Sequence, residues 1–178
     1  MKKIIVVLLL AVAPFSGFSQ SIFDKFEDMD EVGSVVINKG MINMFVTMGG
    51  DQEDPEAKEF MDMAKSINGL KVFTTEDAGV AAKMNAAVKK HLNSSSMEEM
   101  MRVKDKDVNV KFYIKNGKRK DYVSELLMFV TDIKDAKIKG RNFETVLVSI
   151  TGDIDLNKIG TLTKKMNLPK ELNKAGGK

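Results

Sequence analysis

The fold is decided by residues 108–130, which read VNVKFYIKNGKRKDYVSELLMFV. In the first part of this stretch, apolar side chains alternate with polar or amphipathic ones. This period of two is typical of a strand with one buried face. The apolar set is Val108, Val110, Phe112 and Ile114, and the opposite set is Asn109, Lys111, Tyr113 and Lys115.

A second strand follows at Tyr122–Val130. A two-residue turn at Asn116-Gly117 would place Asp121 opposite Phe112 on the buried face, so we predict instead a five-residue loop over Asn116–Lys120. The expected pairs are Ile114–Tyr122, Phe112–Ser124, Val110–Leu126 and Val108–Met128, with Lys111–Glu125 as a charge pair on the other face.

Residues 1–19 have the features of a secretory signal peptide. Two lysines precede the apolar run Ile4–Ala13, and small residues lie at Gly17 and Ser19. The run is shorter than the roughly 20 residues that cross a bilayer, and no later run is long or uncharged enough to do so. We therefore expect cleavage after Ser19 and a protein that is soluble in the periplasm or outside the cell, without membrane insertion.

Composition narrows the class of protein further. The chain has no cysteine, which predicts neither disulfides nor a lipid-anchored N-terminal cysteine, so we do not expect a lipoprotein. Two of the 28 lysines and arginines lie within residues 1–19, which leaves 26 against 25 acids and a formal charge of +1. Nucleic-acid binding needs a concentrated basic surface, and a nearly neutral chain is a poor candidate for it.

The remaining patterns predict an α+β domain over residues 20–168, followed by a disordered tail at 169–178. We expect an antiparallel, partly mixed sheet, in which a C-terminal four-strand meander is continued by two N-terminal strands, with helices packed mainly on the face of Val110 and Phe112. The expected helices are 22–29, 39–48, 55–67 and 76–92, with one more from Asp155; the expected strands besides the hairpin are 32–38, 70–75, 97–104 and 144–152.

The outer face of the predicted sheet is more apolar than an exposed face should be. Two explanations are open. One of the chain's own helices, such as the all-round apolar Lys39–Met48, covers this face. Otherwise it is an interface for a second copy or a partner protein. The predicted interaction face consists of Tyr113, Val123, Leu127, Phe129 and Leu147.

Signals for catalysis are weak. The chain has no G-x-S-x-G turn, and the single His91 falls at the end of a predicted helix, where a structural role is favoured. Asp51, Glu53 and Asp54 form the densest acidic loop, the one place to look for a carboxylate-based hydrolase. We predict no catalytic residue, no metal site and no cofactor.

Two further groups have structural explanations. The methionines Met41, Met44 and Met48 lie among other apolar residues and are expected to fill the core. The basic loop Lys118, Arg119 and Lys120 is expected to be solvated, or to meet an anionic ligand of the envelope.

Three segments and the exported N-terminus carry a resemblance to a known family. They are IFDKF at 22–26, YVSELLM at 122–128 and VSITGDIDL at 148–156. In these the chain resembles the secreted Bacteroidota family described as domain of unknown function 4252. The resemblance implies no activity and no catalytic residues. Members of this family are often encoded near envelope-stress sigma factor systems, so the resemblance implies such a gene neighbourhood. Some members are lipoproteins.

We therefore expect a non-enzymatic exported protein that binds an envelope protein or itself. Two alternatives stay open: a carboxylate-based hydrolase, and a carrier of a small apolar or anionic ligand.

Overall fold

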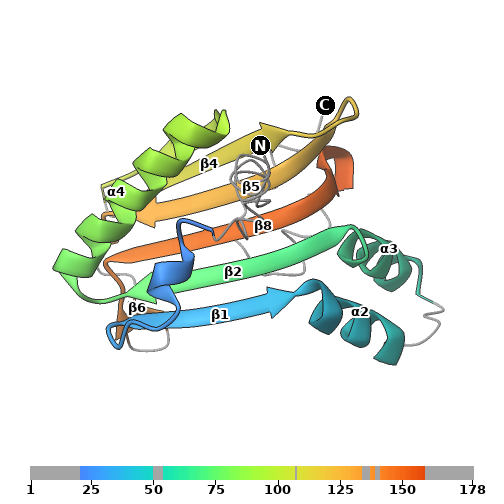
Figure 1. Cartoon of the computed structure of the whole chain (residues 1–178), viewed down its shortest axis with the longest axis horizontal. Helices are drawn as coiled ribbons and strands as arrows, with labels where there is room; N and C mark the ends of the chain where they lie inside the picture. The colour runs from blue at the N-terminus through green and yellow to red at the C-terminus, as the bar shows by residue number, and fades with distance from the viewer. Residues whose placement is uncertain (1–20, 50–53, 107, 134–136, 139–140, 159–178) are drawn as a thin grey trace, which may run out of the picture.

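The computed structural model describes residues 21–49, 54–106, 108–133, 137–138 and 141–158 (Figure 1). Its helical elements are the 3₁₀ turn η1 (Asp24–Phe26), the helices α2 (Lys39–Met48), α3 (Pro55–Ala64) and α4 (Ala78–Ser95), and the 3₁₀ turn η2 (Leu156–Lys158). The strands are β1 (Val32–Asn38), β2 (Ile67–Thr75), β3 (Glu98–Lys104), β4 (Asn109–Asn116), β5 (Tyr122–Thr131), β6 (Lys137–Ile138), β7 (Arg141–Asn142) and β8 (Thr145–Asp155).

Six strands form one open sheet in the order β1-β2-β8-β5-β4-β3, and β6 and β7 form a separate two-stranded pair. Each of the five neighbouring pairs in the large sheet is antiparallel, so the expected partly mixed character is wrong for the described strands. The α+β class is confirmed. The meander β3-β4-β5-β8 and its continuation by the two N-terminal strands also follow the prediction.

The predicted hairpin register is wrong by four residues. Phe112 lies opposite Met128, not Ser124, and Glu125 lies opposite Lys115, not Lys111. The five-residue connection falls at 117–121, where Gly117 N donates to Tyr122 O at 2.8 Å. Because four is an even number, the side chains from Glu125 to Val130 keep their predicted faces. Val123 does not: a register shift between Val123 and Glu125 places it in the cluster of the opposite face.

The predicted assignment of the helix-covered face is wrong for α4, whereas residues of α2 and α3 pack on the predicted face. Helix α4 crosses the face that carries Tyr113, Leu127 and Phe129 (Figure 1). Asp77 caps this helix, its side chain accepting from Val80 N at 2.7 Å. The core on this face combines strand residues with the buried side of α4 and with η1: Phe23, Phe26, Val32, Phe73, Val80, Met84, Ala87, Val88, Tyr113, Leu127, Phe129 and Leu147.

The second face of the sheet is also apolar. Its buried cluster contains Val148, Ile150 and Val123, and near these pack Ile42 of α2 and Leu156 of η2. Both faces of the hairpin thus bear large apolar side chains. Alternation along the strands separates the two faces but does not identify which one α4 covers.

Several boundaries differ from the predictions. Strand β2 begins at Ile67 and passes through Asn68-Gly69, with a register shift against β8 at this point. The predicted helix around 22–29 is only the short η1. The helix predicted from Asp155 is represented by η2, and its continuation lies outside the described residues.

Candidate functional site

The predicted interaction face lies in the interior. Tyr113 and Phe129 are 8% and 4% exposed, and Leu127 and Leu147 are fully buried beneath α4. Val123 is fully buried as well, in the cluster of the second face. The prediction of an exposed interface is therefore wrong here. The structure agrees with the other explanation, in which one of the chain's own helices covers this face. The helix is α4, however, and not α2.

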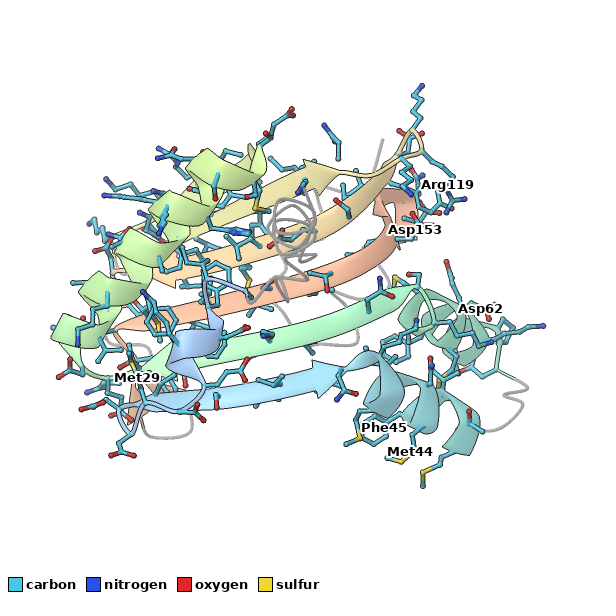
Figure 2. The ribbon with its side chains drawn as sticks, viewed as in Figure 1. Met29, Met44, Phe45, Asp62, Arg119 and Asp153 are labelled. Carbon is cyan, nitrogen blue, oxygen red and sulfur yellow. The ribbon has the colours of Figure 1, made fainter. Side chains whose placement is uncertain are left out.

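The exposed apolar surface lies instead on α2. We call Met41, Met44, Phe45 and Met48 the α2 ridge; their exposed fractions are 42%, 46%, 55% and 76%. Met44 and Phe45 lie on the side of α2 that points away from the sheet (Figure 2). The four positions follow the i, i+3, i+4, i+7 spacing, so they form one continuous stripe along the helix.

The opposite side of α2 anchors the helix. Ile42 is buried and Val46 half-buried, and both belong to the cluster on the second face of the sheet. Asn38, the last residue of β1, caps the helix by accepting from Met41 N at 3.0 Å. The ridge is therefore presented by a fixed helix.

The prediction that these methionines fill the core is wrong. Helix α2 has apolar residues on nearly all sides, which in an isolated sequence predicts burial on more than one side. The sequence contains the ridge spacing at 41, 44, 45 and 48. Because Ile42 and Val46 are apolar as well, the sequence does not single out this stripe from the rest of the helix. Only the position of α2 at one end of the sheet shows which stripe faces outward.

The ridge lies on a helix that has almost no charge. Lys39 is the one charged residue of α2, and its ammonium group donates to the carbonyl of Ile67 at 2.9 Å and to the carbonyl of Lys65. These contacts hold the cation at the start of the helix and against α3's end. The stripe itself offers only thioether and aromatic surface.

A charged cleft of about 990 Å³ lies on the α4 side of the sheet. Within it, Lys71 of β2 binds Glu27 at 2.7 Å and also binds Asp24, which ties η1 to the sheet. Burial by itself would lower the pKa of the Lys71 ammonium, but its hydrogen bonds and attraction to Asp24 and Glu27 outweigh burial and raise it. Lys71 is thus a charged structural link and unsuited to be a base.

His91 is a largely buried and paired histidine. Its Nε2 lies 2.7 Å from Glu125 of β5, and both side chains are largely buried. The ring of Phe23 packs edge-on against the imidazole, with centroids 5.1 Å apart. This contact joins α4, β5 and the segment before η1 at one point.

The basic loop does not present three free cations. Arg119 forms an ion pair with Asp153 of β8, and its guanidinium lies 3.5 Å from the centre of the Tyr122 ring. Lys118 and Lys120 are exposed on either side. The loop is therefore partly committed to holding the hairpin end against β8.

Most of the acidic loop falls outside the described residues. Asp51 and Glu53 lie outside the described residues, and Asp54 is exposed just before α3. Within the described part of the chain, no three His, Cys, Asp or Glu side chains gather as a metal ion would require. The described helices also include none that is both long and apolar enough to cross a membrane.

Comparison with protein families assigns the chain to one family. A family model described as domain of unknown function (DUF4252) matches residues 26–162, which include every strand of the sheet. The chain belongs to this family. No curated protein and no solved structure matches it.

Proposed function

We propose that this protein is a non-enzymatic binding protein of the bacterial envelope and that the α2 ridge is the surface that meets its partner. The observation that carries the proposal is the stripe of Met41, Met44, Phe45 and Met48 left exposed on a capped, anchored helix. Contiguous exposed apolar side chains on a soluble domain mark interaction sites.

The spacing of the ridge indicates how it is bound. A helix that enters an apolar groove of another protein uses anchors at i, i+3, i+4 and i+7, the spacing that the ridge has. Methionine side chains are flexible and polarisable, so they adapt to the shape of the groove, while Phe45 supplies a rigid aromatic anchor. The ligand class is therefore an apolar groove on a folded protein.

A lipid surface is the less favoured ligand. Interfacial helices combine an apolar stripe with lysines and arginines on the polar side. Helix α2 has only one such residue, Lys39, at its first position. Export, which the features of residues 1–19 support, would place the partner in the envelope; a link to stress signalling would then pass through the external part of that system.

The test is a capture experiment with matched variants of the chain lacking residues 1–19. Phe45→Lys places a charge in the middle of the ridge, whereas Met100→Lys changes an apolar residue of 42% exposure on β3. We expect a protein from the envelope extract to be retained by the wild type and by Met100→Lys, and to be reduced about tenfold or more with Phe45→Lys.

Two outcomes would contradict the proposal. Equal retention by all three proteins would mean that the ridge is not the binding surface. Binding of the wild type to phospholipid vesicles, lost in Phe45→Lys without any captured protein, would assign the ridge to a membrane surface. Circular dichroism of each variant controls for folding.

A further inference from the structure

The outer edge of β1 has no strand beside it among the described residues. Strand β1 is the terminal strand of the sheet, and no described strand pairs with its outer side. Residues 33–36 are exposed, with Val35 at 52% and Val36 at 46%. From Val32 to Asn38 the strand has no charged residue and no proline. Such an edge leaves backbone N–H and C=O groups able to pair with another strand.

We propose that β1 pairs antiparallel with β1 of a second copy of this chain, so that two six-stranded sheets become one. Two identical strands paired about a two-fold axis must place one residue opposite itself. The axis falls at Val35. Ser34 then lies opposite the second copy's Val36, and Gly33 lies opposite the second copy's Ile37. In this register each face of the sheet continues across the junction, because opposed residues share a face.

One feature of the sequence selects this register and favours a second copy over an unrelated strand. Glu31, exposed just before β1, comes opposite the second copy's Lys39 just after it. The Lys39 ammonium uses two of its three donors on the carbonyls of Lys65 and Ile67, so one remains for a carboxylate. Moving the axis to Ser34 or Val36 removes this charge pair.

This pairing goes beyond the proposed function and does not depend on it, since β1 and the α2 ridge are separate surfaces. If the ridge captures a partner while the chain stays monomeric, only the pairing fails. If the chain pairs through β1 and the ridge captures nothing, only the proposed function fails.

The absence of cysteine from the chain makes a crosslinking test clean. Directly opposed residues in an antiparallel pair have Cα atoms about 4.5–5.5 Å apart, within the range that a disulfide spans. Val35→Cys should therefore give a disulfide-linked dimer under mild oxidation. In Ile37→Cys the two thiols lie four residues apart along the ribbon, roughly 13 Å, and should not crosslink. Val103→Cys on β3 is the control for the opposite edge.

Two results support the proposal. Val35→Cys forms a disulfide-linked dimer, and the other two variants form at least tenfold less of it. The unmodified protein has the mass of two chains in sedimentation equilibrium. No crosslink at Val35→Cys in a folded protein, or equal crosslinking at Val35→Cys and Val103→Cys, overturns the proposal. Stronger crosslinking at Ile37→Cys overturns the register and the Glu31–Lys39 pairing with it.

Discussion

The two edges of the sheet are built in opposite ways. At the β3 edge, four of seven residues are charged, Glu99 and Arg102 form an ion pair at 2.6 Å, and the pairing with β4 shifts register between Glu99 and Met101. At the β1 edge there is no charge and no such irregularity. Charges and bulges are the means by which proteins prevent edge pairing. Among the described residues, these features are present at the β3 edge and absent from the β1 edge, which agrees with the proposed pairing through β1.

The largest effect should come from giving the β1 edge a charge. Val35→Lys places two ammonium groups opposite each other on the proposed axis and removes apolar contact from both copies. We expect the dimer dissociation constant to rise about a hundredfold, about 2.7 kcal/mol. Sedimentation equilibrium measures it. The same substitution on the other edge, Val103→Lys, should leave the mass unchanged; an equal loss in both would remove the distinction between the edges.

The next largest effect should come from breaking an ion pair near one edge of the sheet. Lys71→Met leaves Asp24 and Glu27 without their shared cation and loosens η1 and the residue after it, Glu27, whose carbonyl accepts from Ser34 Oγ of β1. We expect the free energy of unfolding to fall by about 1–2 kcal/mol. Arg102→Met breaks an ion pair on the exposed β3 edge, and its denaturant midpoint should match that of the wild type.

The pH dependence of the Lys71 link has a definite sign. Its pKa is raised in the folded protein. The stabilisation is therefore complete below the ordinary lysine pKa and is lost as pH rises through the raised value. The difference in denaturant midpoint between wild type and Lys71→Met should be constant near neutral pH and shrink in strong alkali. A difference that grows in alkali would contradict this assignment.

The smallest effect should come from removing the protection of β3. With Glu99→Val and Arg102→Val combined, the second edge loses two of its four charges but keeps its register shift. We expect a few-fold increase in light scattering at high concentration, from species heavier than two chains. Unchanged scattering would mean that the register shift alone is enough to block this edge.

Much of the sheet could be predicted because alternation is a local property. Val110, Phe112 and Ile114 share a face in any register because they alternate along one strand, and the pairing of β4 with β3 and β5 follows from short connections. The register itself was missed because it depends on contacts that are distant in the chain. Glu125 faces Lys115 and also meets His91 on α4, a contact that the hairpin sequence does not contain.

The site could not be predicted for a related reason. The residues chosen for an interface, such as Leu127 and Phe129, are apolar in the same way as Phe112 and Met128 on the opposite face, and only the course of α4 decides between them. In α2, the exposed stripe and the buried Ile42 are equally apolar. Burial of a side chain depends on what packs over it, and in both cases that element is remote in sequence.

Asn38 has a consequence for how the molecule could bind. It ends β1 and caps α2, so no loop separates the edge strand from the ridge. In a pair of copies joined along β1, the two ridges would lie beyond opposite ends of the shared ribbon, more than roughly 25 Å apart. Such an assembly is bivalent. A target that displays two grooves at that distance would be held by avidity, with an effective affinity well above that of either ridge by itself.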